Sequence, residues 1–179
     1  MRERIDDSSV NARVAAIRPP VESFDSFYRR EYYSLVGLAY VLTGSHHASE
    51  DLVQLAFTEA HRKWDRVGSY DQPGAWLRRV LVNKSRSRFR RLGSEAKALT
   101  RIGNRRQDDI QPGERSTEVW AAVRQLPNRQ AAVIALKYWE DLAIADIAKV
   151  LDCSTETVKT HLKRARATLS RQLENWEGA

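Results

Sequence analysis

The sequence predicts an all-α protein in which two small helical modules are joined by a flexible linker. Apolar residues recur at the spacing of amphipathic helices in two long segments, and few β-branched residues alternate as they do in strands. Between these segments the apolar period disappears. We therefore expect a disordered tail over 1–20, a first module over 21–92, a linker over 93–115 and a second module over 116–175.

The first module is predicted to contain three helices. The first covers 24–42, and Thr43-Gly44-Ser45 ends it, because glycine suits the left-handed position that follows a helix. Ser49 is expected to cap the second helix. The apolar stripe of this second helix consists of Val53, Phe57, Ala60 and Trp64. A loop over 65–73 then precedes a third helix over 74–92.

The second module is predicted to end in a helix-turn-helix. A helical pattern from Val119 stops at Pro127, resumes to Tyr138, and is followed by a short helix over 144–151. After a turn at Asp152-Cys153, Ser154-Thr155 can cap a new helix, whose buried stripe would be Val158, Leu162, Ala165 and Leu169. The other faces of this helix carry Lys159, Lys163, Arg164, Arg166 and Arg171. A recognition helix for the major groove needs this division between an apolar and a cationic side.

The overall charge of the chain agrees with a polyanionic partner. The net charge is +7 and the pI is near 9.8, which favours nucleic acid or a membrane surface. No segment approaches the about 20 apolar residues of a membrane span, and no signal peptide is evident, so we expect a cytoplasmic protein that binds no membrane. We also find no nucleophile–base pair and no cluster of metal ligands, and we expect no enzyme activity, cofactor or metal.

A second region with the composition of a nucleic-acid site lies in the first module. Basic residues crowd the segment 77–106, in which Glu95 is the only acid. Aromatic residues, Trp64, Tyr70 and Trp76, lie just upstream, and cations beside rings are typical of sites for single-stranded DNA. Because both tryptophans lie on apolar stripes, we expect them in the core. The loop from Val67 to Gly74 is the better candidate for touching an unstacked base.

One patch differs from the cationic surroundings. Glu50, Asp51 and Gln54 fall on one side of the second helix, beside Leu52 and Leu55, which its apolar stripe does not use. Two acids in a first turn favour the helix dipole, and the same patch would also suit a protein-binding face. The pattern alone leaves both interpretations open.

Several short motifs follow one another in order along both modules. The first module contains Leu42-Thr43-Gly44, Glu50-Asp51-Leu52-Val53-Gln54 and Ala75-Trp76-Leu77-Arg78-Arg79-Val80-Leu81-Val82-Asn83. The second contains Leu126-Pro127-Asn128-Arg129-Gln130-Ala131, Tyr138-Trp139-Glu140-Asp141-Leu142, and Asp146-Ile147-Ala148 followed by Thr157-Val158-Lys159-Thr160-His161-Leu162-Lys163-Arg164-Ala165-Arg166. With these motifs the chain resembles a small extracytoplasmic-function (ECF) sigma factor of the sigma-70 family, and it is most similar to actinobacterial members.

The resemblance implies partners and site residues. The partners would be core RNA polymerase, promoter DNA and an anti-sigma factor. The clamp helices of the polymerase would contact Glu50, Asp51, Gln54 and Leu55, which favours the protein-binding interpretation of the patch. The −10 promoter element would contact Val67, Ser69, Tyr70, Arg79, Asn83 and Arg86. The −35 element would contact Thr155, Lys159, Thr160, His161, Lys163, Arg164 and Arg166.

The chain departs from the family pattern at a few positions. Leu55 stands where relatives often have an acid, so the polymerase contact would be less polar. Asp152 replaces the glycine common in the turn, and aspartate tolerates a left-handed conformation better than most residues. His161 occupies a position that faces the duplex in relatives, which predicts a divergent −35 preference.

Two other functions compete with this prediction. A stand-alone helix-turn-helix regulator would bind duplex DNA tightly without polymerase and would leave the acidic patch unused. A nuclease would need clustered carboxylates for metal ions, and Glu50-Asp51 is the only close pair near the basic surface. For a sigma factor with two tethered modules, we expect weak promoter binding by the free chain, because the modules can pack together or be masked by an anti-sigma partner.

Overall fold

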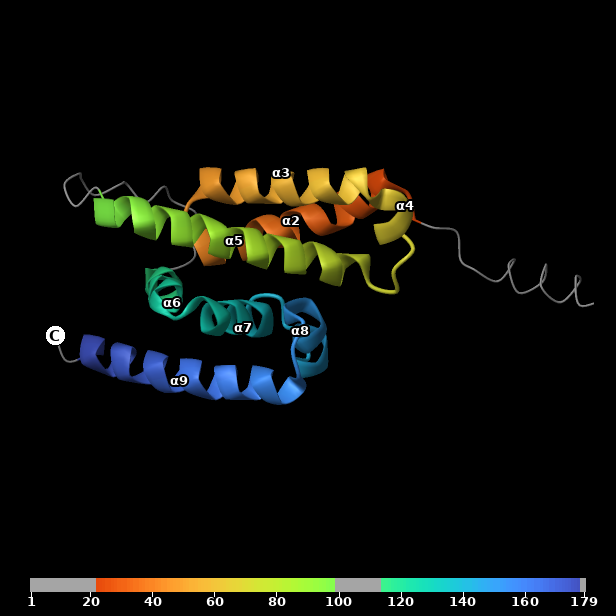
Figure 1. Ribbon diagram of the computed structural model, residues 1–179. Coiled ribbons are helices and arrows are strands. Elements are labelled where there is room, and N and C mark those ends of the chain that lie inside the picture. Colours follow the sequence, from red (N-terminus) through yellow and green to blue (C-terminus); the bar gives the residue numbers. More distant parts are fainter. Residues whose placement is uncertain (1–21, 99–113, 178–179) are drawn as a thin grey trace, which may run out of the picture.

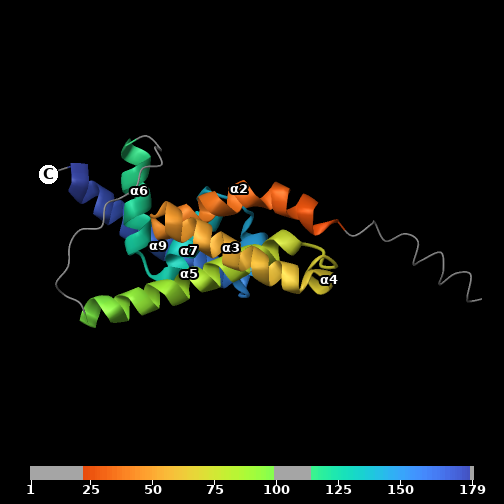
Figure 2. The ribbon, with the colours of Figure 1, turned by 90° about the horizontal axis from the view of Figure 1, so that it is seen from above.

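The computed structural model of the chain describes residues 22–98 and 114–177, with side chains over 22–85 and 118–172. The all-α prediction is confirmed, because the described residues form eight helices and no strand. The first module contains α2 (Phe24–Thr43), α3 (His46–Arg62), α4 (Trp64–Val67) and α5 (Pro73–Ala98). The second contains α6 (Glu114–Gln125), α7 (Asn128–Tyr138), α8 (Ile144–Leu151) and α9 (Thr155–Glu177). The two modules form two stacked layers (Figures 1 and 2).

The turn between α2 and α3 ends the first helix as expected and begins the second earlier than expected. Gly44 follows α2 with a φ of 69°, and its N–H donates to the carbonyl of Tyr40. The cap of α3 is Ser45 and not Ser49, because the Ser45 side chain accepts a hydrogen bond from the N–H of Ala48. Ser49 is fully buried, and its hydroxyl donates to the Ser45 carbonyl at 2.6 Å.

The apolar face of α3 is wider than its predicted stripe. Leu52 is only 2% exposed, so the expectation that it lies outside the buried face is wrong, whereas Leu55 is 52% exposed. The reason is that α3 packs on both α2 and α5, which buries a broad sector of the helix. Trp64 opens α4 instead of ending the stripe of α3, and its ring packs 4.8 Å from that of Phe27.

The helices next to the expected linker are longer than predicted. The third predicted helix was expected to end near Leu92, but α5 continues to Ala98, and α6 begins at Glu114, inside the expected linker. Good helix formers follow Gly93, and one internal glycine costs only about 1 kcal/mol. The expected tail and the rest of the linker lie outside the described residues.

The helix-turn-helix forms as predicted. The stripe residues Val158, Leu162 and Ala165 are buried, and the Ser154 hydroxyl accepts a hydrogen bond from the N–H of Thr157 at 3.1 Å. Asp152 follows α8 in the left-handed conformation expected for it, with a φ of 54°. Helix α9 therefore packs on its own module with one face and turns its other faces outward.

The two layers meet along a seam and share a hydrophobic core. Helix α5 packs against α8, while α2 packs against α6 and α7. The indole of Trp139, which follows α7, lies over Gly37 of α2, where an added Cβ would come within 2.6 Å of the ring. This packing of one module on the other agrees with the expectation that the modules can close on each other, and it determines which side chains remain accessible.

Candidate nucleic-acid and protein interfaces

The loop after α4 offers two of the three side chains predicted for the −10 strand. Ser69 is exposed and Tyr70 is half-buried. Val67 does not fit the prediction, because its side chain is only 1% exposed. It lies at the end of a four-residue helix and packs inward, so it anchors the loop and leaves base contact to its neighbours.

A cavity of about 560 Å³ opens beside this loop. Helix α4, the loop and the start of α5 line it with the rings of Tyr70 and Trp76 and with the cations of Arg66 and Arg79. Lys149, from α8 of the second module, also lines this cavity. Rings beside cations suit an unstacked base and its phosphate. In this closed arrangement, however, one wall of the cavity belongs to the other module.

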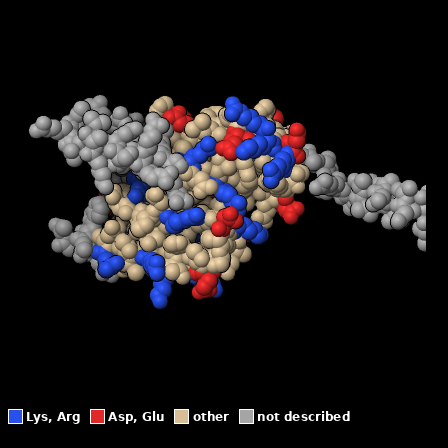
Figure 3. Space-filling model, viewed as in Figure 1, with Lys and Arg blue, Asp and Glu red and all other residues tan. Residues whose placement is uncertain are grey.

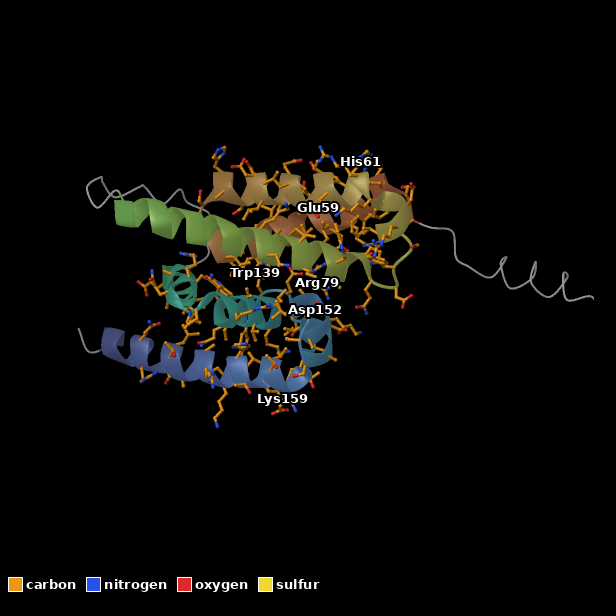
Figure 4. The ribbon with its side chains drawn as sticks, viewed as in Figure 1. Glu59, His61, Arg79, Trp139, Asp152 and Lys159 are labelled. Atoms are coloured by element: carbon orange, nitrogen blue, oxygen red, sulfur yellow. The ribbon has the colours of Figure 1, made fainter. Side chains whose placement is uncertain are left out.

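Arg79, predicted to contact the −10 strand, is held by the end of α8. Its Nε atom donates to the carbonyl oxygen of Val150 at 3.1 Å, and its Nη2 atom donates to the carbonyl of Lys149. The carboxylate of Asp152 lies 3.5 Å from the same guanidinium. Figure 4 shows Arg79 and Asp152 facing each other between α5 and α8.

The remaining predicted −10 residues lie further along α5. Asn83 is exposed on the surface of the helix. Arg86 belongs to α5, and its side chain lies outside the described residues. Ser85, between them, is buried and donates its hydroxyl to the Val82 carbonyl.

Next to Arg79 lies a buried cluster of charged residues that joins the two modules. The sequence did not predict this cluster. The Arg78 guanidinium lies 2.7 Å from Glu31 of α2 and 2.6 Å from Glu140, which follows α7. Glu140 is only 3% exposed in its side chain and also accepts a hydrogen bond from the Ser34 hydroxyl at 2.6 Å. Burial opposes the charge of Arg78, but the Glu140 and Glu31 carboxylates outweigh it and raise the pKa of Arg78. No local sequence signal pairs residues this far apart.

The predicted −35 surface lies along the outer side of α9. Figure 3 shows blue side chains along this helix at the lower edge of the molecule, and Figure 4 places Lys159 there. The exposed residues are Thr155, Lys159, Thr160, Lys163, Arg164 and Arg166. His161 differs, because it is half-buried and its Nδ1 atom is buried with no hydrogen-bond partner among the described residues.

Arg166 has a defined position on this surface. Its Nε atom donates to the hydroxyl of Tyr138 at 2.8 Å, and its guanidinium lies 5.7 Å from the centre of the same ring. Tyr138 was expected on an apolar stripe, but it is 52% exposed. Its ring thus extends the cationic surface of α9 instead of filling the core.

The predicted polymerase face lies on α3, on the side of the first layer that points away from the second module (Figure 1). Glu50, Gln54 and Leu55 are exposed, and Asp51 is half-buried with its carboxylate 3.8 Å from His47. This face combines acids with an exposed leucine on an otherwise cationic protein, which suits a protein partner.

Two further classes of site were sought. No three His, Cys, Asp or Glu side chains come together as metal ligands would in the described part of the chain. None of the helices over 22–98 and 114–177 has the length and apolar composition that a bilayer crossing requires.

Comparison with known proteins finds the same two modules. Residues 27–95 match the family described as Sigma-70 region 2, and residues 116–169 match Sigma-70, region 4. The ECF RNA polymerase sigma factor SigM of Mycobacterium tuberculosis is 32% identical over 174 residues, which cover 96% of this chain and 86% of SigM. The RNA polymerase sigma-E factor of Streptomyces avermitilis is 27% identical over 87% of both chains.

Two solved structures have a similar fold over most of the chain. RpoE of Bartonella quintana, solved with the anti-sigma factor NepR, has a TM-score of 0.66 and 26% identity over 83% of this chain and 97% of its own. CnrH, solved with the cytosolic domain of CnrY, has a TM-score of 0.61 and 25% identity over 94% and 97%. From the near full-length similarity to SigM and the two sigma-70 regions, the chain belongs to the ECF RNA polymerase sigma factors of the sigma-70 family, which direct promoter-specific transcription initiation.

Proposed function

We propose that the two modules divide promoter recognition, the first binding core polymerase and the −10 element and the second binding the −35 element. The observation that carries this proposal is the position of two unlike surfaces. The cationic outer side of α9 and the acidic, leucine-bearing face of α3 lie on opposite sides of the molecule (Figure 1). The chain could therefore contact DNA and polymerase together, and it would add base readout without a catalytic step of its own.

On the polymerase side, Glu50, Asp51, Gln54 and Leu55 would meet the clamp helices. The exposure of Leu55 supports a contact with an apolar centre. The acids around it would give the contact its direction, because charge pairs at a rim favour specificity and association rate. Leu52, being buried, would support this face from beneath.

On the −10 side, Ser69 and Tyr70 would meet an unstacked base in the cavity beside Trp76. Stacking on a ring contributes about 1–3 kcal/mol per base, which is comparable to the cost of extruding that base. Arg79, Asn83 and Arg86 would then hold the strand along α5. Val67 would act only through the loop that it anchors.

On the −35 side, the exposed residues of α9 would enter the major groove. Thr155, Lys159, Thr160, Lys163 and Arg164 are close enough to the start of the helix to reach base edges, at about 1–3 kcal/mol for each good contact. Arg166 would contact a phosphate. His161 would touch the duplex only with the exposed edge of its ring.

The setting follows from this function. A protein that works on promoter DNA with bacterial polymerase acts in the cytoplasm. RpoE and CnrH were each solved with a partner, the anti-sigma factor NepR and the cytosolic domain of CnrY. By analogy we include an anti-sigma factor among the partners of this chain.

The experiment that tests this function is co-elution of the full chain with bacterial core RNA polymerase. Asp51→Arg should abolish co-elution without unfolding the protein, because it reverses a charge at the centre of the α3 face. Asp25→Arg is the matched control, since it makes the same charge change on an exposed site of α2. Tight duplex binding without any association with polymerase would instead indicate an autonomous helix-turn-helix regulator.

A further inference from the structure

The seam between the modules contains an ion-pair cluster with no role inside the second module. The hydrogen-bond partners of the Glu140 carboxylate, Ser34 and Arg78, both belong to the first module. Arg78 in turn is held by Glu31 of its own module. If the modules separated, the Glu140 carboxylate would become solvated and would lose its hydrogen bonds to Ser34 and Arg78. Glu140 therefore stabilises the closed arrangement, while the contacts of Arg78 with Glu31 and Ser34 remain within the first module.

Arginines also reach across the seam in both directions to the ends of helices. Arg79 of the first module donates to the last carbonyls of α8, at Lys149 and Val150. Arg124 of the second module approaches the Val41 carbonyl near the end of α2, at 3.5 Å. The carbonyls at a helix C-terminus lack helical partners and carry partial negative charge, so Arg79 meets a favourable site. Arg124 is half-buried, and burial lowers its pKa.

The end of α8 offers Arg79 the same chemistry as a nucleic-acid strand. Two carbonyl oxygens accept hydrogen bonds from its guanidinium, as base edges do, and Asp152 supplies an anion as a phosphate does. Asp152 adopts the left-handed conformation with a φ of 54°, and glycine would provide the same turn without the charge.

We propose that the turn of the helix-turn-helix is an intramolecular ligand of Arg79 that competes with the −10 strand. The competition rests on the proposed role of Arg79 in strand binding. Arg79 cannot hold the end of α8 and a promoter strand together, and Lys149 narrows the cavity that the base would enter. The free chain thus withholds its −10 surface until the modules separate.

Three acid-to-amide substitutions test this competition, since each removes one negative charge with little change in shape. Glu140→Gln weakens the buried cluster, and Asp152→Asn removes the ion pair with Arg79 while asparagine keeps the left-handed turn. Asp141→Asn is the matched control. Asp141 also has a positive φ, its side chain is 98% exposed, and its ion pair joins it to Lys137 of its own module.

The full chain is examined in two ways. Small-angle X-ray scattering gives the radius of gyration, and fluorescence anisotropy gives the affinity for a fluorescein-labelled oligothymidine strand, a probe that needs no promoter sequence. When only the open fraction binds, the apparent affinity rises with that fraction. We expect Glu140→Gln to expand the chain and tighten strand binding roughly tenfold, which is the response to a modest shift in a two-state equilibrium. Asp152→Asn should tighten it about two- to threefold, and Asp141→Asn should match wild type.

Each other outcome overturns the proposal in a recognisable way. Unchanged size and affinity in Glu140→Gln would mean that the cluster does not hold the modules together. Expansion without tighter strand binding would mean that Arg79 is not withheld, and an equal gain in Asp141→Asn would reduce the effect to net charge. Circular dichroism checks that each variant keeps its helices. Because scattering needs no polymerase, a failure of the sigma-type co-elution would not be confused with a failure of the closure.

Discussion

The two predicted DNA-reading surfaces differ in accessibility although the same chain closes around both. On α9, Thr160, Lys163 and Arg164 are exposed. On α5, Arg79 is occupied by the end of α8, and Lys149 forms a wall of the neighbouring cavity. Closure of the modules therefore covers part of the surface proposed for the −10 element and leaves the surface proposed for the −35 element exposed.

The difference arises from how each helix is packed. Helix α9 buries the single stripe of Val158, Leu162 and Ala165 against its own module, so its opposite side stays in solvent. Helix α5 packs on α2 and α3 with one side and on α8 with another. A helix between two layers has little exposed surface, so DNA that binds at Arg79 must replace contacts made by the protein.

This comparison implies an order of events for the free chain. Duplex binding through α9 requires no rearrangement, whereas strand capture by α5 requires the modules to separate. The polymerase face on α3 is also accessible in the closed arrangement, since α3 lies on the outer side of the first layer (Figure 2). Docking on polymerase can therefore precede the opening that exposes Arg79.

The largest expected effect comes from Arg78→Ala. This change leaves the Glu140 carboxylate buried without its cation, whereas Glu31 keeps its ion pair with Arg30, and breaking a buried pair costs about 3–5 kcal/mol. The modules relieve this cost by separating. Hydrogen–deuterium exchange should become faster in α7 and α8 along the seam and stay unchanged in α3. Arg29→Ala, which removes an exposed arginine of α2, is the control, and equal protection in both variants would contradict a closed free state.

A smaller effect separates the two DNA surfaces directly. Lys163→Ala should weaken binding of the free chain to a labelled duplex and lower the slope of log affinity against log salt by about 0.9, the value for one phosphate contact. Arg79→Ala should leave duplex binding by the free chain unchanged, because that guanidinium is engaged with α8. Salt titrations followed by anisotropy measure both. Equal losses in the two variants would break the comparison between masked and open surfaces.

The sequence predicted those parts of the fold that depend on local pattern. The stripe from Val158 to Ala165, the cap at Ser154 and the left-handed turns at Gly44 and Asp152 are all confirmed. Each follows from the spacing of a few neighbouring residues or from the conformational preference of one residue. The fold class and the helix-turn-helix needed nothing more, because amphipathic helices with clear ends leave few alternative architectures.

The sequence did not predict the burial of site residues that depends on neighbours distant in the chain. Val67 lies in a helix too short to show a period, so its burial could not be separated from that of the exposed loop beside it. Leu52 is buried because a second helix covers α3 from another side. Arg78 was counted only among the basic residues of the segment 77–106, since 62 residues separate it from Glu140 and only the packing of the layers brings the two together.

Gly37→Ala should sharpen the comparison by acting on the two layers with opposite sign. Alanine is favoured over glycine inside a helix by about 1 kcal/mol, so α2 should be stabilised. Its Cβ would lie 2.6 Å from the Trp139 ring, so the ring must shift and the seam should loosen. Hydrogen exchange is expected to slow within α2 and quicken within α7. Slower exchange in both helices would show that Trp139 adjusts without opening the seam.

The smallest predicted effect concerns the open surface itself. Tyr138→Phe removes the hydroxyl that accepts a hydrogen bond from Arg166 and keeps the ring beneath its guanidinium. Because the pair is exposed, the loss should not exceed about 1 kcal/mol, or roughly fivefold in duplex affinity. If Tyr138 acts by orienting Arg166 toward a phosphate, the substitution should have no effect in an Arg166→Ala background. A double-mutant cycle with the labelled duplex measures this coupling. Independent, additive losses would instead mean that Tyr138 contacts the DNA by itself, and that the −35 surface extends beyond α9.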